Sequence, residues 1–205
     1  MIRYLTAQSL AQYPYLQDSM FKDRAHQFST RLKWDVSVDA NGWEQDNYDT
    51  DTAIYAIWQR KDGRHGGSMR FLPTTGATMI NDHFVHVTGH KIVDKKIWET
   101  TRFCLAPDAP SKVTAALMLA GAELGLAMGL SHSVGIFDKR MIRIYRTLQW
   151  SPKVLGTVGK GRDAISAGLW TFDKIVPLRL ARLAGLPSQF AAHCWQRDQG
   201  RAIAA

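Results

Sequence analysis

Apolar residues recur at two different spacings in the first third of the chain. Between residues 8 and 33 they return every three or four positions, which predicts one or two short amphipathic helices. Residues 52–58 (TAIYAIW) and 68–72 (SMRFL) are short apolar runs separated by the turn sequence KDGRHGG, and this arrangement predicts a β-hairpin. The segment 34–51 is rich in Asp and Asn and predicts a long loop, which in a compact domain is usually functional or disordered.

The rest of the chain alternates between predicted strands and predicted helices. Ser111 is placed to cap an Ala/Leu-rich helix that ends near Met128. A basic amphipathic helix is predicted at 138–148, with Met141, Ile142, Ile144, Tyr145 and Leu148 facing inward. The other predicted elements are strands at 98–105, 131–137 and 164–172, a Gly/Lys-rich loop at 156–162 and a final short helix at 176–183. This alternation predicts an α/β protein built on a mixed sheet, and residues 1–205 are expected to form a single domain.

Composition narrows the class of protein. Charged residues make up 21% of the 205 residues and aromatic residues 10%, which excludes an intrinsically disordered chain. Cys104 and Cys194 are too few for a disulfide scaffold or a four-cysteine zinc site. No apolar run approaches the roughly 20 residues of a membrane span. The N-terminal sequence also lacks the pattern of a secretory signal, so we expect a cytoplasmic location without a membrane span.

Charge is distributed unevenly along the chain. Residues 1–108 carry 13 basic and 13 acidic side chains, whereas residues 109–205 carry 13 basic and 5 acidic ones. The formal net charge of +8 therefore lies entirely in the second half. This asymmetry points to an acidic partner, which can be a nucleic acid, a membrane surface or an acidic protein, or else to a solvated basic face that aids solubility.

Three apparent motifs do not support a function. The segment GTVGKG (156–161) lacks the spacing of a phosphate-binding P-loop and the Ser or Thr that should follow its Lys. His83, His86 and His90 lie partly on a strand-like stretch, where residues three apart face opposite sides, so we expect no metal site. The Arg-rich helix near 139–146 has no short turn and partner helix before it, so a helix-turn-helix is not expected.

Ionisable and aromatic residues gather in positions of the first half that do not follow a core pattern. Glu99 and Arg102 lie on one predicted strand but three residues apart, so a regular strand would place them on opposite sides, and only a bulge would bring them together. Carboxylates, arginines and aromatic rings together would suit a small zwitterion or dication, although a set of structural ion pairs is the commoner explanation of such residues. The set comprises Arg24, Phe28, Trp34, Glu44, Asp46, Asp49, Arg70, Glu99 and Arg102.

The order of these residues resembles that of the LuxI-type acyl-homoserine-lactone (autoinducer) synthases. The resemblance runs from about residue 24 to 156, with a weaker continuation to the end. Each piece is weak alone, but their order and spacing together are specific. The pieces are Arg24-x3-Phe28-x5-Trp34 with WDVSV, E-x-D-x-Y-D (Glu44, Asp46, Tyr48, Asp49), Arg70 in MRFLPTTG, MINDHF ending at Phe84, and WETTRF with Glu99 and Arg102.

The resemblance implies a fold and a reaction. The fold would be similar to that of the GNAT N-acyltransferases, with a mixed, V-shaped sheet flanked by helices. The enzyme would join S-adenosylmethionine (SAM) to an acyl group from a thioester on acyl carrier protein or coenzyme A. The SAM amine would form the amide, and the SAM carboxylate would then close the lactone and release methylthioadenosine. Both compounds are substrates, so no cofactor and no metal are expected.

The resemblance also assigns roles in the N-terminal half. Glu99 is the candidate acceptor of the amine proton, and Arg102 is expected to support Glu99 or the acidic loop. Asp46 and Asp49 would recognise the amine and sulfonium side of SAM, with Arg24 and Arg70 organising those carboxylates or the ligand carboxylate. Phe28 and Trp34 would cover SAM.

The C-terminal half would serve the acyl donor. Members of the family that make 3-oxo-acyl products often have a Thr where this chain has Gly135, so a product without a 3-oxo group is expected. The expected acyl-pocket residues are Thr101, Met118, Met128, Gly135, Phe137, Met141 and Trp150, although apolar residues on these elements also suit a plain core. The expected acyl-carrier surface, which would equally suit acyl-CoA, comprises Lys139, Arg143, Arg146, Lys153, Lys160 and Arg162.

Two other functions remain open on sequence alone. One is a GNAT-like N-acyltransferase that acts on another amine, although the E-x-D-x-Y-D loop and the WETTR strand argue against it. The other is a basic nucleic-acid-binding module, which would bind DNA or RNA in a salt-dependent way and would not bind SAM.

Overall fold

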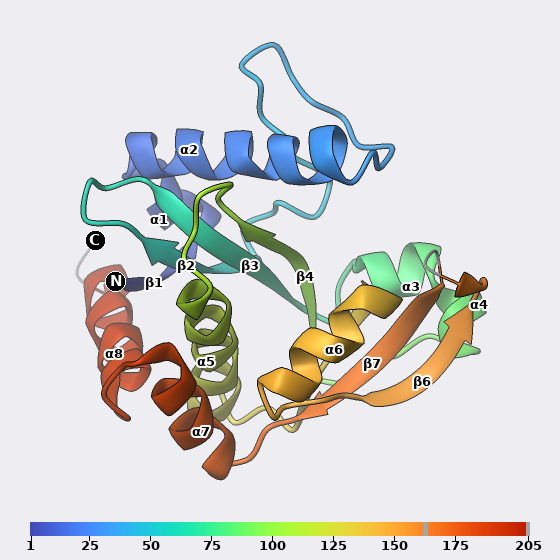
Figure 1. Ribbon diagram of the computed structural model, residues 1–205. Coiled ribbons are helices and arrows are strands. Elements are labelled where there is room, and N and C mark those ends of the chain that lie inside the picture. The colour runs from blue at the N-terminus through green and yellow to red at the C-terminus, as the bar shows by residue number, and fades with distance from the viewer. Residues whose placement is uncertain (162–163, 204–205) are drawn as a thin grey trace.

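The computed structural model describes residues 1–161 and 164–203 of the protein. Its strands form one seven-stranded sheet in the order β1-β2-β3-β4-β5-β7-β6 (Figure 1). Neighbouring strands are antiparallel except β4 and β5, which run parallel. The strands are β1 (Ile2–Thr6), β2 (Ile54–Gln59), β3 (His65–Pro73), β4 (Ile97–Leu105), β5 (His132–Asp138), β6 (Lys153–Val158) and β7 (Ile165–Thr171).

The sheet opens between β4 and β5. These strands are paired at only three positions, from Ile97 opposite His132 to Glu99 opposite Val134. Beyond Glu99 they diverge, and β1–β4 lean away from β6 and β7 (Figure 1). The mixed, V-shaped sheet predicted from the resemblance is therefore confirmed.

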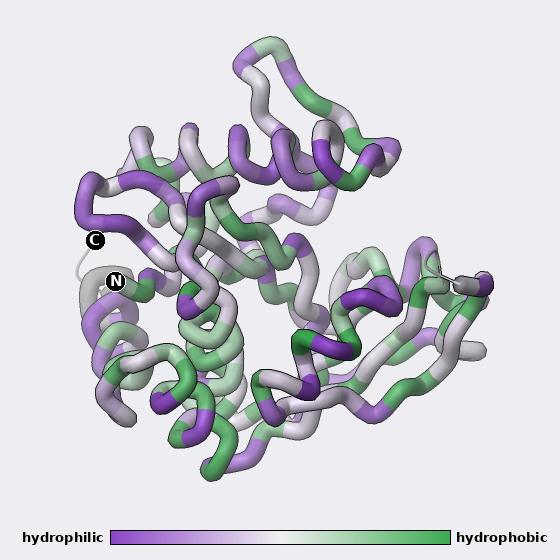
Figure 2. Tube along the Cα trace, in the orientation of Figure 1, coloured by the Kyte–Doolittle hydropathy of each residue, from purple (hydrophilic) through white to green (hydrophobic). Residues whose placement is uncertain are grey.

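Helices cover both faces of the sheet. A core cluster that includes Met69 and Phe71 of β3 and Leu117 of α5 lies on one face, and α5 is apolar along most of its length (Figure 2). The other face packs against α2 through Leu16, Phe21 and other apolar side chains. The helices are α1 (Ala7–Ala11), α2 (Pro14–Ala25), the π-helix η1 (His26–Arg31), α3 (Met79–His83), α4 (Val85–Thr88), α5 (Lys112–Ala127), α6 (Lys139–Thr147), α7 (Ile175–Ala184) and α8 (Phe190–Ile203).

A buried histidine connects α2 to the sheet. The imidazole of His65 on β3 bonds to Asp23 of α2 through Nδ1 at 2.7 Å and to Ser68 through Nε2 at 2.9 Å. Burial lowers the pKa of His65, although Asp23 opposes the shift, so the ring is a neutral link between these groups. Because Arg24 follows Asp23, this link fixes the end of α2 that enters the functional site.

The last helix caps the edge of the sheet. The backbone N–H of Tyr4 on the edge strand β1 donates to Asp198 of α8 at 2.9 Å, and Arg197 donates to the backbone oxygen of Ile2 at 2.7 Å. These bonds satisfy polar groups that an edge strand would otherwise expose. Neither β1 nor α8 was predicted from the pattern of apolar residues.

Several predicted local structures are wrong. The histidine-containing stretch that looked partly like a strand forms the short helices α3 and α4. Residues 156–158 of the predicted loop belong to strand β6. Ile144 on α6 is exposed rather than inward, and the side chain of Ser111 makes no capping bond to α5. None of the described helices is long and apolar enough to cross a membrane.

Candidate active site

Arg24 is held by two acidic residues of the long loop that follows η1. Its Nε donates to Glu44 at 2.6 Å, and its two terminal nitrogens donate to the two oxygens of Asp49, each at 2.9 Å. Burial disfavours the charge on Arg24, but the two carboxylates outweigh it and raise the pKa. Burial likewise disfavours the charge on Asp49, and Arg24 and Arg70 outweigh it and lower the pKa of that carboxyl.

Two further arginines complete a closed network. Arg70 on β3 donates to both oxygens of Asp46 at 2.5 and 3.0 Å and lies 2.8 Å from Asp49. Arg102 on β4 lies 2.9 Å from Glu44 and 2.7 Å from Asp46. Three guanidinium groups therefore neutralise three carboxylates. These ion pairs attach the acidic loop to the sheet. The structural ion pairs that were one explanation of these residues on sequence alone are therefore present.

A bulge on β4 places Arg102 in this network. The register between β3 and β4 shifts between Ser68 and Arg70, and Arg102 adopts a left-handed backbone conformation with φ of 53°. Arg102 contacts Glu44 and Asp46, so of the two predicted partners it supports the acidic loop and not Glu99.

Glu99 lies at the point where β4 and β5 part. Its side chain is fully buried and accepts hydrogen bonds from the backbone N–H groups of Met79 at 3.0 Å and Ile80 at 2.6 Å, in the first turn of α3. Burial raises the pKa of Glu99 to about 7, against the opposing effect of these two N–H groups. A carboxyl group with this pKa can exchange a proton near neutral pH.

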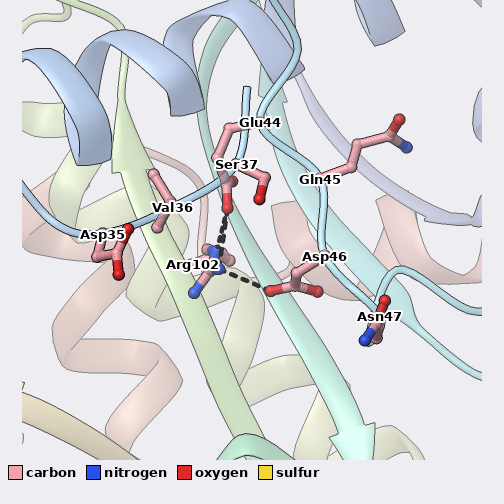
Figure 3. Close-up of a pocket in the computed structure, with 8 residues that line it drawn as sticks. All are labelled: Asp35, Val36, Ser37, Glu44, Gln45, Asp46, Asn47 and Arg102. Carbon is pink, nitrogen blue, oxygen red and sulfur yellow. Dashed lines mark hydrogen bonds and ion pairs between the residues drawn. The ribbon is translucent and has the colours of Figure 1, made fainter. Parts of the chain in front are cut away.

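A cavity of about 490 Å³ opens beside the network (Figure 3). Three of its lining residues carry carboxylates: Glu44 and Asp46 are paired with arginines of the network, and Asp35 adds a negative charge outside it. The cavity therefore suits a ligand with net positive charge. In Figure 3 the side chain of Arg102 points toward Glu44 and Asp46. The lining residues are Asp35, Val36, Ser37, Glu44, Gln45, Asp46, Asn47 and Arg102.

The two aromatic residues of the motif stack on each other. The ring centroids of Phe28 and Trp34 lie 5.1 Å apart with an interplanar angle of 16°. Phe28 is buried and its ring lies under the guanidinium of Arg102 at 5.3 Å, whereas Trp34 is 46% exposed. The pair therefore extends from the ion-pair network to the protein surface, and Trp34 directly precedes the segment that lines the cavity.

Four residues without a predicted role lie in or beside the site. Glu44 bridges Arg24 and Arg102, and Asp35 lines the cavity. The hydroxyl of Tyr48 donates to Asp82 of α3 at 2.9 Å. Burial of the hydroxyl, and to a smaller extent this hydrogen bond, raises the pKa of Tyr48 to about 12. Tyr55 on β2 donates to Asp49 at 2.8 Å. Glu44 and Tyr48 stand in the E-x-D-x-Y-D motif and Asp35 in WDVSV, whereas nothing in the sequence marks Tyr55.

The predicted acyl-pocket residues divide between the two faces of the sheet. Met118, Met128, Phe137, Met141 and Trp150 belong to the cluster on the α5 face, as predicted members of one apolar group. Thr101 does not join them, because its hydroxyl accepts a bond from Arg70 at 3.1 Å, and its place in an acyl pocket stays a prediction. A Cβ atom at Gly135 would lie 2.7 Å from the backbone oxygen of Thr100, so this glycine permits the close approach of β5 to β4.

The predicted acyl-carrier residues lie on the other arm of the V. Lys139, Arg143 and Arg146 are exposed at positions of α6 that share one side of the helix. Lys153 and Lys160 are exposed on and after β6, and Lys160 lines a second cavity of about 340 Å³ together with Lys139. Arg162 lies outside the described residues. Among the described residues, no group of three potential ligands for a metal ion is found.

The fold is that of the GNAT-like acyltransferases. The chain aligns with a putative N-acetyltransferase from Lactobacillus plantarum at a TM-score of 0.54 and 16% identity, over 84% of this chain and 99% of that one.

 An acyl-CoA N-acyltransferase from Pseudomonas aeruginosa aligns at a TM-score of 0.56 and 11% identity, over 82% of this chain and 97% of that one. These likenesses establish the GNAT-like fold.

Closer relatives narrow the class to one family. The sequence model of the autoinducer synthase family matches residues 8–173, so the protein belongs to that family. An acyl-homoserine-lactone synthase from Rhizobium etli is 38% identical over 204 residues, which cover 94% of this chain and 96% of the relative. The solved structure of a CoA-dependent acyl-homoserine lactone synthase, BjaI, with SAM and isopentyl-CoA aligns at a TM-score of 0.82 and 22% identity, over 91% of this chain and 90% of that one.

Proposed function

We propose that the protein transfers an acyl group from a thioester to the amine of SAM and then forms an acyl-homoserine lactone, which would act as a quorum-sensing signal. The observation that carries this proposal is the acidic cavity lined by Asp46, together with a buried Glu99 whose pKa is about 7 and is influenced by the charges of Arg70 and Asp46. SAM has a sulfonium, an ammonium and a carboxylate group, so its net charge is positive and complements the three carboxylates that line the cavity.

The N-terminal half is proposed to bind SAM. Asp46, which is partly exposed and lines the cavity, contacts the cationic part of SAM. Arg24 and Arg70 hold the acidic loop through Asp49 and Asp46, and they act on SAM through those carboxylates. Phe28 and Trp34 cover the ligand at the cavity entrance.

Glu99 is proposed to accept the proton of the SAM amine, directly or through one water molecule. An α-amino group has a pKa of about 7.7–8.0, so this proton must leave before the nitrogen attacks. The nitrogen then forms a bond to the thioester carbonyl carbon, the carbon–sulfur bond breaks, and the thiolate takes up a proton. In the second step the SAM carboxylate attacks its own γ-carbon, and the bond to the sulfonium breaks to release methylthioadenosine.

The C-terminal half is proposed to hold the acyl donor. The gap between β4 and β5 begins beside Glu99, and the apolar side chains of Met118, Phe137 and Trp150 lie on one side of these strands. An acyl chain placed there brings its thioester close to the SAM amine. Residues 1–205 would thus act as one domain with two halves of different function.

The donor is proposed to be an acyl carrier protein or coenzyme A. Both carry negative charge that the exposed lysines and arginines of α6 and β6 would attract. Since SAM and these acyl thioesters are cytoplasmic metabolites, we place the reaction in the cytoplasm.

The product is proposed to lack a 3-oxo group. The close approach of Gly135 to the backbone of Thr100 leaves no room for a Thr side chain at that position. The hydroxyl that often accompanies 3-oxo products in the family is therefore missing from this strand. An unsubstituted or 3-hydroxy acyl chain is expected instead.

One experiment tests the whole proposal. Purified protein is incubated with SAM and a panel of acyl carrier protein and coenzyme A thioesters, and mass spectrometry measures methylthioadenosine and acyl-homoserine lactone together. We expect both products in equal amounts with at least one donor, and much less of either product with Glu99→Gln. Failure to release methylthioadenosine across the whole panel would contradict the proposal, and a 3-oxo product would contradict the inference from Gly135.

A further inference from the structure

Helix α7 exposes a surface that neither the core nor the proposed reaction uses. Three aliphatic side chains on this helix are strongly exposed: Ile175 at 52%, Leu178 at 53% and Leu183 at 42%. Val176, Leu180 and Ala184 on the opposite side of the helix are buried in the core beside α5. The helix is therefore apolar on its buried side and partly apolar on its outer side, where the core cannot explain it.

Basic residues surround these aliphatic side chains. Lys174, Arg179 and Arg182 are exposed on the same side of α7, and within the described part of the chain none of them forms an ion pair. The nearby acid is Asp173, whose carboxylate accepts a bond from the N–H of Ile175 at 2.7 Å. Figure 2 shows hydrophobic and hydrophilic residues alternating along this helix.

The α7 surface, defined by Lys174, Ile175, Leu178, Arg179, Arg182 and Leu183, lies far from the candidate active site. In Figure 1, α7 is at the lower edge of the molecule and the loop 34–51 that carries the acidic residues is at the upper edge. In the same view β6 and most of α6, which carry the proposed acyl-donor surface, lie to the right of α7, and only the lower end of α6 comes near it. Contact through α7 therefore leaves the candidate active site and the proposed acyl-donor surface accessible.

We propose that the α7 surface binds the protein reversibly to anionic lipid bilayers. A helix that lies in a membrane interface inserts aliphatic side chains between the head groups, while basic residues beside them meet the lipid phosphates. Ile175, Leu178 and Leu183 supply the first contact, and Lys174, Arg179 and Arg182 the second. Charge complementarity thus selects an anionic bilayer as the occupant of this surface, and three aliphatic side chains give binding that is reversible.

Vesicle co-sedimentation of the purified full-length protein tests this proposal. The vesicles contain phosphatidylglycerol and phosphatidylcholine in equal parts or phosphatidylcholine alone, at low and high salt. We expect sedimentation with the anionic vesicles at low salt and little with the neutral ones. Arg179→Glu with Arg182→Glu should reduce the partition coefficient by about tenfold or more, and Ile175→Ser with Leu178→Ser should also reduce it severalfold.

Matched control variants distinguish binding through the α7 surface from binding through the overall positive charge of the protein. Lys61→Glu with Lys91→Glu changes the net charge by the same amount at exposed positions elsewhere, and Val93→Ser removes an aliphatic side chain that is 63% exposed. Both controls should keep most of the vesicle binding. The proposal is overturned if wild-type protein does not sediment with anionic vesicles, or if the controls lose binding as much as the α7 variants.

Two further measurements decide whether the α7 surface binds a lipid bilayer, a protein partner or a second copy of the chain. Release of methylthioadenosine without vesicles should be the same in the α7 variants as in the wild type, so a failed lipid test would not bear on the proposed reaction. A specific loss of turnover with acyl carrier protein donors would assign α7 to a protein partner and overturn the lipid proposal. Light scattering that showed a wild-type dimer, broken by Ile175→Ser with Leu178→Ser, would overturn it in favour of a second copy.

Discussion

Asp46 and Asp49 share one arginine but differ in their access to solvent. Both carboxylates pair with Arg70, and the backbone N–H of Asp46 donates to Asp49 at 2.9 Å. The Asp46 side chain is 18% exposed and lines the cavity, whereas that of Asp49 is 3% exposed and is also bonded to Arg24 and Tyr55. Asp49 has no free position for a ligand, so of the two acids that were predicted to recognise SAM we expect only Asp46 to contact it.

We therefore expect different results from Asp49→Asn and Asp46→Asn. Asp49→Asn leaves two buried guanidinium groups short of a counter-charge and should lower the free energy of unfolding by about 3–5 kcal/mol. Asp46→Asn also removes a carboxylate from two arginines, but water can reach this position, so it should lower the free energy of unfolding by less; it should also raise the KM for SAM, because this carboxylate faces the cavity. Urea unfolding and steady-state kinetics measure the two effects. Equal loss of stability in both variants would contradict this division of roles.

The pKa of Glu99 predicts how turnover depends on pH. If Glu99 accepts the amine proton, kcat/KM should rise with pH until about 7, where this carboxyl becomes ionised, and should fall about tenfold per unit below it. Glu99→Gln should retain the fold, lose most of the activity and lose this dependence. A folded Glu99→Gln variant with undiminished turnover would remove Glu99 from the proposed role.

The same raised pKa of Glu99 predicts that stability, unlike turnover, increases as the pH falls. Between about pH 4.3 and 7 the folded protein binds a proton at Glu99 that the unfolded chain does not, so the contribution of this group to stability increases as the pH falls through 7. We expect this contribution to be absent from Glu99→Gln. Unfolding curves of both proteins at pH 8 and pH 5.5 measure it, and an identical change in the two proteins would contradict the assignment.

The sequence predicted the central strands and the long helices better than the ends of the fold. Strands β2, β3 and β4 are continuous apolar or alternating runs, so their pattern identified them. Strand β1 has five residues and α3 and α4 have five and four, which is too short for a periodicity to emerge. Strand β6 is mostly exposed and contains Gly156, so it lacks an apolar pattern.

The site residues could be named from the sequence, but their pairing could not. The arginines and acids come from α2, the long loop, β3 and β4, and spacing alone does not say which of them meet. The decisive detail is the bulge at Arg102, because a regular strand would have turned this side chain away from Asp46. A left-handed residue within a strand leaves no mark in the sequence when it is not Gly.

Trp34 offers a test of the proposed cover over SAM. Its ring is 46% exposed and stacks on Phe28, so it contributes little to the core. We expect Trp34→Ala to change the free energy of unfolding by less than about 1 kcal/mol and to raise the KM for SAM severalfold. Trp34→Phe keeps an aromatic face and should retain most of the affinity. An unchanged KM in Trp34→Ala would show that this ring does not cover the ligand.

Gly135 links the packing of the sheet to the proposed acyl site. A Cβ atom added there would lie 2.7 Å from the backbone oxygen of Thr100, so the backbone of β4 or β5 would have to shift to accept it. Gly135→Ala should therefore lower the free energy of unfolding by about 1–3 kcal/mol and reduce turnover, because Glu99 lies at the same junction. The matched control is Gly76→Ala, where the nearest atom would be 3.7 Å away. Equal stability of the two variants would show that the junction yields to an added methyl group, and the sheet would then also accept the Thr that accompanies 3-oxo products.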